Sequence, residues 1–139
     1  MESGLKDSSS AVVLDTSAMV AILLREPGYQ NLAHRISDAR ILLAGTPTIL
    51  EAAMVLSSRL SRDARPMLAD LFRTINGHPV AFTDVHMGVA LDAFLRFGKG
   101  RHPAGLNIGD CMSYAVAHVS GFPLLYVGND LSKTDIESA

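Results

Sequence analysis

Four acidic side chains lie at the places where the chain passes between predicted strands and helices, and they could do chemistry together. They are Asp15, Glu51, Asp110 and Asp130. Asp15 and Asp130 come just after predicted strands, whereas Glu51 and Asp110 lie early in predicted helices. Side chains at such positions point into the crevice beyond the carboxyl ends of parallel strands, so we expect the four carboxylates to converge at one sheet edge.

Carboxylates that are packed together repel one another, and protonation or a bound cation relieves the repulsion. Oxygen ligands with no His or Cys at ligand spacing favour Mg²⁺, with Mn²⁺ as the alternative, over Zn²⁺. Such an ion activates water and neutralises the charge that builds on a phosphate during hydrolysis. The hydroxyls of Thr16 and Ser17 follow Asp15 directly and would orient its carboxylate or a water molecule.

Each acid also has a purely structural explanation. Asp15 can serve as the N-cap of the helix that follows it, and Asp130 can be an ordinary turn residue. Glu51 and Asp110 each stand three residues after a capping residue, which is the spacing of a capping box. Those capping residues would be Thr48 and Asn107. The conjunction of four acids at one sheet edge is what favours a common site.

The elements that must position these acids alternate along the chain. Short apolar runs predict buried strands at 11–14, 41–44, 80–82 and 124–127. Amphipathic patterns and capping signals predict helices at 16–25, 29–40, 46–60, 66–76, 84–97 and 107–120. Strands that are apolar on both faces and alternate with helices indicate an α/β fold, with a parallel sheet covered on both faces.

The chain has 139 residues, 48% hydrophobic residues and a formal net charge of -2, which predicts one globular domain and no overall basic character. Residues 1–10 are polar and are expected to form a disordered tail. The single cysteine, Cys111, is expected to be a buried structural thiol in a reducing compartment. With no signal peptide and no apolar run long enough to span a bilayer, a cytoplasmic location without membrane contact is expected.

Four segments together resemble the motifs of PIN-domain ribonucleases, in particular VapC-type toxins of VapBC toxin–antitoxin systems. They are 13–18, 48–52, 98–111 and 127–136, and the resemblance runs from Val12 to Ile136. It implies that 11–139 is a single PIN domain, a three-layer α/β/α sandwich around a mainly parallel sheet of four to five strands. It also implies metal-dependent cleavage of RNA (transfer, ribosomal or messenger), a homodimer, and inhibition by a VapB-type antitoxin. The metal-binding role would fall on Asp15, Glu51, Asp110 and Asp130. Leu131 departs from the motif, where relatives often have Phe.

An acidic pocket repels RNA, so nearby cations should help. Arg96, Lys99, Arg101 and His102 cluster in or beside the loop 98–106, and we expect some of them to contact phosphates. The alternative is a solvated basic loop in which Arg101 pairs with a nearby acid. The mean hydropathy of +0.24 is high for a small monomer, which favours apolar surface covered by a second copy or an antitoxin.

Three other functions stay open. A haloacid-dehalogenase phosphatase also has an aspartate after its first strand, but it needs a second Asp where this chain has Ser17. A receiver-like acidic metal-binding module groups two acids at the first strand, and here Val13 and Leu14 precede Asp15. An inactive PIN-like domain that serves only protein contacts is the third.

Overall fold

Four parallel strands form one sheet in the order β3-β2-β1-β4 in the computed structural model, which describes residues 10–139. They are β1 (Ala11–Leu14), β2 (Ile41–Gly45), β3 (Gly77–Val80) and β4 (Leu124–Leu125). Of the tail that the sequence predicts to be disordered, residues 1–9 lie outside the described residues. Ser10 is held, because its carbonyl accepts hydrogen bonds from the N–H groups of Arg40 and Ile41.

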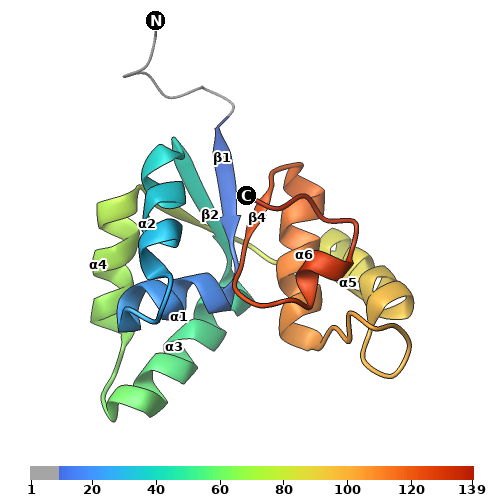
Figure 1. Ribbon diagram of the computed structural model, residues 1–139, viewed down its shortest axis with the longest axis horizontal. Helices are drawn as coiled ribbons and strands as arrows, with labels where there is room; N and C mark the ends of the chain where they lie inside the picture. Colours follow the sequence, from blue (N-terminus) through green and yellow to red (C-terminus); the bar gives the residue numbers. More distant parts are fainter. Residues whose placement is uncertain (1–9) are drawn as a thin grey trace, which may run out of the picture.

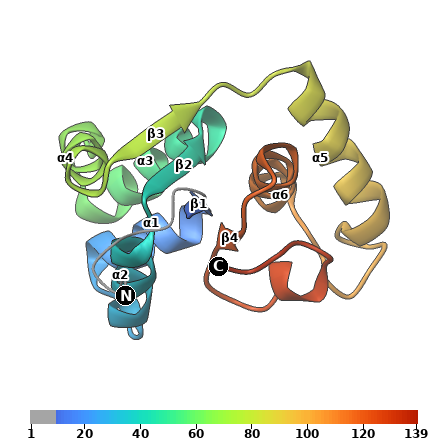
Figure 2. The ribbon, with the colours of Figure 1, turned by 90° about the horizontal axis from the view of Figure 1, so that it is seen from above.

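Helices cover both faces of this sheet, which gives the three-layer α/β/α architecture expected from the sequence (Figure 1, Figure 2). One layer holds α1 (Thr16–Leu24), α2 (Tyr29–Asp38), α3 (Thr46–Leu60) and α4 (Arg65–Ile75). The opposite layer holds α5 (Asp84–Phe97) and α6 (Ile108–Ser120). After α6 the chain returns to the sheet as β4 and then forms a short 3₁₀ helix, η1 (Leu131–Lys133).

Two hydrophobic cores lie on the two faces of the sheet, and the strand residues alternate between them. In β1, Leu14 packs in the core under α1–α4, whereas Val13 packs in the core under α5 and α6. In β4, Leu125 packs in the core under α1–α4, and Leu124 packs in the core under α5 and α6. This alternation is the period of two of an extended strand, and burial on both faces explains why the strands are almost wholly apolar.

The chain order creates a topological switch beside β1. From β1 the chain winds outward through β2 to β3, with α1–α4 on one face, and then returns through α5 and α6 to β4 on the other side of β1. Because successive crossovers leave β1 in opposite directions, a crevice forms beyond the carboxyl ends of β1 and β4. Asp15 is the first residue after β1 and therefore stands at this crevice.

The predicted boundaries of two strands are wrong. A strand was expected at 80–82, but β3 spans Gly77–Val80, because Asn76 adopts a left-handed conformation (φ 57°) and ends α4 one residue before the strand. The strand expected at 124–127 ends at Leu125. Its neighbour β1 ends at Leu14, so the N–H of Val127 has no strand to pair with and donates instead to Ser17 Oγ at 2.9 Å.

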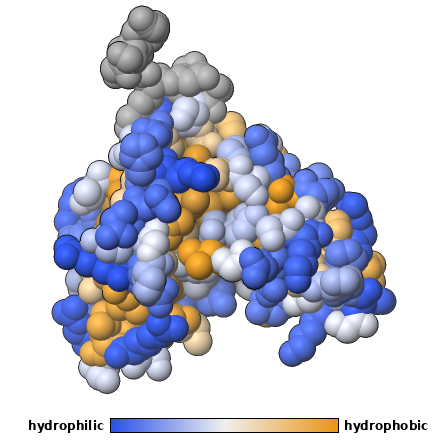
Figure 3. Space-filling view, in the orientation of Figure 1, coloured by the Kyte–Doolittle hydropathy of each residue, from blue (hydrophilic) through white to orange (hydrophobic). Residues whose placement is uncertain are grey.

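Some large apolar side chains remain exposed. On the face shown in Figure 3, hydrophobic residues gather over α1 and α3 between hydrophilic surface. Independently of that view, the exposed large apolar side chains include Leu50 and Met54 on α3, Leu91 on α5 and Ile108 at the start of α6. None of the helices within residues 10–139 combines the length and the apolar character that crossing a membrane requires.

Candidate metal centre

Asp15 is almost fully buried at the end of β1 and is held from two sides. Its Oδ2 accepts hydrogen bonds from the backbone N–H of Ser17 at 3.1 Å and from Ser17 Oγ at 2.5 Å. Its Oδ1 accepts from Ser113 Oγ of α6, also at 2.5 Å. The residue is thus the N-cap of α1 and at the same time an acid in the crevice, so the structural explanation holds without excluding a site.

Glu51 reaches the crevice from α3 and is tied to α1. Its Oε1 accepts a hydrogen bond from Thr16 Oγ1 at 2.8 Å, so Thr16 orients Glu51 and not Asp15. The capping box expected for Thr48 and Glu51 is wrong, because α3 begins at Thr46, two residues earlier. With its first turn completed before Glu51, the helix leaves this carboxylate free to point into the crevice.

Asp110 lies in the first turn of α6 and caps that helix. Asn107 accepts a hydrogen bond from the N–H of Asp110, and the Asp110 carboxylate accepts one from the N–H of Asn107, which confirms the capping box. Burial raises the pKa of the Asp110 carboxyl to about 6, against the lowering effect of the Asn107 N–H. The negative charges of Asp15, Asp130 and Glu51 raise this pKa further, so these three acids lie within electrostatic reach of Asp110.

Asp130 takes the outermost place of the four. It is exposed and precedes η1, a short helix that the sequence analysis did not anticipate. Its charge acts on Asp110, but it does not line the pocket that the other three acids share. The structure therefore brings Asp15, Glu51 and Asp110 together and leaves Asp130 at the rim.

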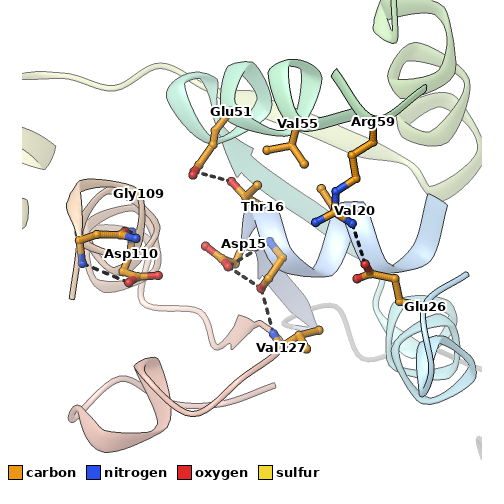
Figure 4. Close-up of a pocket in the computed structure, with 12 residues that line it drawn as sticks. Asp15, Thr16, Val20, Glu26, Glu51, Val55, Arg59, Gly109, Asp110 and Val127 are labelled. Carbon is orange, nitrogen blue, oxygen red and sulfur yellow. Dashed lines mark hydrogen bonds and ion pairs between the residues drawn. The ribbon is translucent and has the colours of Figure 1, made fainter. Parts of the chain in front are cut away.

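The three acids open into a pocket of about 280 Å³ between α1, α3 and the start of α6. Figure 4 shows Asp15, Glu51 and Asp110 pointing into this hollow from three different elements. At the other end of the pocket Arg59 of α3 forms an ion pair with Glu26, with 3.0 Å between Nη1 and Oε2. One end of the pocket is therefore lined by carboxylates, and the other end is lined by the guanidinium of Arg59, which is paired with Glu26.

Gly109 makes room for the Glu51 carboxylate. A Cβ atom at Gly109 would lie 2.7 Å from Glu51 Oε1, which is closer than real contacts allow. Sequence analysis missed this residue together with Ser113 and Arg59. Ser113 stands three residues after Asp110, on the same helix face, and Arg59 stands two turns after Glu51, so helical spacing could have identified both.

The cations that were expected to contact RNA do not line this pocket. Arg96 forms an ion pair with Asp135 at 3.3 Å and lies over the ring of Phe97. Arg101 lies over the ring of Phe94, with its Cζ 5.7 Å from the ring centre. Among residues 10–139 no ion pair joins it to an acid, so the alternative in which it pairs with a nearby acid is not observed there. Lys99 is exposed in the loop between α5 and α6.

The donor set fits a hard divalent cation in chemical type. All its charged groups are carboxylates, and the negative charges of Asp15, Asp130 and Glu51 add to burial in raising the pKa of Asp110. Within residues 10–139, no three Asp, Glu, His or Cys side chains converge closely enough to ligate one ion in their present rotamers. Each of the three pocket carboxylates instead accepts a local hydrogen bond, Asp15 from Ser17 and Ser113, Glu51 from Thr16, and Asp110 from the Asn107 N–H.

Comparison with known sequences identifies one family over almost the whole chain. A profile of the PIN domain matches residues 12–137. The chain is 41% identical over 127 residues to ribonuclease VapC36 of Mycobacterium tuberculosis, covering 91% of each chain. It is 40% identical over 139 residues to a VapC ribonuclease of Rhizobium meliloti, covering 88% of this chain and 97% of that one.

Solved structures show the same fold at lower sequence identity. The crystal structure of Mycobacterium tuberculosis VapC20, described as a sarcin–ricin loop cleaving toxin, matches with a TM-score of 0.73 at 16% identity, over 92% of this chain and 98% of that one. A toxin–antitoxin complex from Klebsiella pneumoniae matches with a TM-score of 0.66 at 12% identity, over 89% and 92%. At sequence identities this low, the two matches support the fold of this chain and nothing further.

Proposed function

This chain belongs to the PIN domain family, in its VapC branch, and on that premise we propose that it is the toxin endoribonuclease of a type II toxin–antitoxin pair. Its reaction is the hydrolysis of RNA phosphodiester bonds with a divalent metal, Mg²⁺ or Mn²⁺, held by Asp15, Glu51, Asp110 and Asp130. One observation carries the proposal: three acids from three elements share one pocket, and the charges of Asp15, Glu51 and Asp130 help to raise the pKa of Asp110.

A bound Mg²⁺ or Mn²⁺ would supply an activated water and would neutralise the charge that develops on the phosphate. Ser17 and Ser113 donate hydrogen bonds to the two oxygens of Asp15, and they would hold its carboxylate in place at the end of β1. Glu51 and Asp110 would each exchange a present hydrogen bond for a metal contact. The apolar side chains of Val20 and Val55, which also line the pocket, would limit the water that reaches it.

The partners in this proposal are RNA, a VapB-type antitoxin and a second copy of the chain, acting together in the cytoplasm. Apolar side chains that stay exposed on α3 and α5, such as Met54 and Leu91, support a protein partner. The alternative of an inactive PIN-like or receiver-like module is weaker, because all four acids are present and the charges of the other three act on Asp110.

The test is cleavage of total cellular RNA with added Mg²⁺ or Mn²⁺ and with a chelator, with the cut ends mapped. Asp15→Asn and Asp110→Asn should each slow cleavage on the order of a hundredfold, the scale of removing one group that stabilises developing charge. Asp92→Asn is the matched control, because Asp92 is exposed on α5 and does not line the pocket. Cleavage that survives both pocket variants at full rate would show the proposal to be wrong.

A further inference from the structure

Arg59 is the one cationic side chain that lines the acidic pocket among residues 10–139. The other charged residues that line the pocket are Asp15, Glu26, Glu51 and Asp110. An RNA strand that enters it carries a negative charge on every phosphate, so its approach is opposed along the whole length of the pocket. A cation at the end far from Asp110 would offset this repulsion where no metal is expected.

The helical register of α3 sets where this cation stands. Glu51, Val55 and Arg59 are spaced by four residues, so they form one row along the pocket wall. Eight residues of α-helix rise by about 12 Å, so Arg59 is displaced along the pocket from the carboxylates. Figure 4 shows the Arg59 guanidinium apart from Glu51, beside Val20 and directed toward Glu26.

The guanidinium is available, because its ion pair is a weak one. The side chains of Arg59 and Glu26 are 55% and 37% exposed, and a solvated pair of this kind contributes little to folding stability. The pair nevertheless keeps the guanidinium at the pocket wall and not extended into solvent. Arg96 forms a similarly exposed pair with Asp135, but it does not line the pocket.

We propose that Arg59 binds a backbone phosphate that flanks the bond to be cut, and that Glu26 competes with that phosphate for the guanidinium. The guanidinium can donate two parallel hydrogen bonds to phosphate oxygens, as it can to a carboxylate. Glu26 thereby keeps Arg59 in place when the pocket is empty and opposes RNA when it is filled. This inference rests on the proposed ribonuclease function and adds a substrate-binding residue to it.

The test uses the full chain and a fluorescein-labelled, single-stranded RNA of 20 nucleotides with mixed sequence, in chelator and on an Asp110→Asn background so that cleavage is too slow to disturb the binding measurement. Arg59→Gln should weaken binding about tenfold at low salt, and should reduce the slope of log affinity against log salt by about 0.7, the value for one lost contact to a single strand. The RNA affinity of Arg59→Lys should lie between those of the Asp110→Asn parent and of Arg59→Gln, because lysine keeps the charge but loses the paired hydrogen-bond geometry.

Glu26→Gln separates this role from a structural one. Loss of the competing carboxylate should strengthen RNA binding, so the two partners of one ion pair should change affinity in opposite directions. Arg73→Ala is the matched control, because Arg73 also pairs with an acid, Asp70, but on the exposed surface of α4 away from the pocket. It should leave the affinity unchanged.

Unchanged affinity and salt slope in Arg59→Gln, or a loss in Arg73→Ala as large as in Arg59→Gln, would overturn this inference. So would a weakening of RNA binding by Glu26→Gln, because the pair would then act only by holding the structure. If the unmodified chain cleaves RNA in each of these cases, the proposed function stands and only the role of Arg59 falls. If the unmodified chain neither binds nor cleaves RNA, both fall.

Discussion

Ser113 donates a hydrogen bond to Asp15 over 2.5 Å, and both side chains are buried. The contact joins α6, which belongs to one layer of the fold, to the end of β1 at the crevice. Thr48 Oγ1 lies 3.5 Å from the same Ser113 oxygen, so α3 meets this group as well. One serine hydroxyl thus connects the elements that carry Asp15, Glu51 and Asp110.

Ser113→Ala should destabilise the protein by about 1–3 kcal/mol, because a buried carboxylate loses a hydrogen bond that water cannot replace. It should also weaken metal binding, since Asp15 loses the group that fixes Oδ1. Urea unfolding and metal titration measure the two effects. Ser120→Ala, near the end of the same helix, removes only a bond to the Ala117 carbonyl and should cost far less. Equal costs for the two variants would contradict the role assigned to Ser113.

Asp110→Asn should stabilise the metal-free protein at neutral pH while it slows cleavage on the order of a hundredfold. The folded-state pKa of Asp110 is raised from 3.8 to about 6, so the native state binds the proton more tightly than the unfolded state. The resulting penalty is absent below pH 3.8, grows as pH rises toward 6, and is fully present above 6. After allowance for solvent screening, the gain should be about 1 kcal/mol.

Thermal unfolding in chelator, on both sides of pH 6, measures this effect. The advantage of Asp110→Asn over the unmodified chain should shrink as the pH is lowered through this range. If Asp110→Asn is less stable than the unmodified chain at neutral pH, the ionised Asp110 carboxylate stabilises the fold. The pKa of Asp110 in the folded state would then not be raised.

Affinity for Mg²⁺ or Mn²⁺ should fall as pH decreases through about 6, because Asp110 must give up its proton to act as a ligand. Calorimetric titration of Mn²⁺ across this range tests the expectation. In Asp110→Asn the residual affinity should depend less on pH over the same interval. An affinity that is flat through pH 6 in the unmodified chain would remove Asp110 from the ligand set.

Gly109→Ala should damage metal binding without damaging the fold. The added Cβ would stand 2.7 Å from Glu51 Oε1, so the flexible carboxylate must move, while alanine favours the helix by about 1 kcal/mol over glycine. Gly88→Ala is the matched control, because Gly88 lies in α5 and a Cβ there meets nothing within 4 Å. Both variants should keep the melting temperature or raise it, and only Gly109→Ala should lower metal affinity.

Much of the fold follows from local patterns in the sequence, because parallel strands buried on both faces are unbroken apolar runs and helix ends carry capping residues. The errors arose where tertiary contacts decide. Asn76, and not Gly77, ends α4, which moves β3 toward the N-terminus. A tertiary contact also decides the partner of Glu51. The sequence spacing suggested a capping box with the nearby Thr48, but the hydrogen-bond donor is Thr16, 35 residues away.

The acids of the site were accessible to sequence reasoning because each lies at a junction that the topology brings to one crevice. The groups that hold them were less accessible. Ser113 and Gly109 act through contacts with Asp15 and Glu51 that depend on how α6 packs against the rest of the fold. The loop arginines were favoured because they are close in sequence to Asp110, whereas the cation in the pocket, Arg59, comes from α3.

The central claim is that carboxylates from separate elements form a single divalent-metal site. Mn²⁺ binding followed by electron paramagnetic resonance tests it most directly, in the unmodified chain and in Asp15→Asn, Glu51→Gln, Asp110→Asn and Asp130→Asn. We expect one saturable class of Mn²⁺ site that is lost or strongly weakened in the first three variants, and weakened less in Asp130→Asn, whose residue lies at the rim. Binding that stays as tight as in the unmodified chain in Asp15→Asn, Glu51→Gln and Asp110→Asn would contradict the claim.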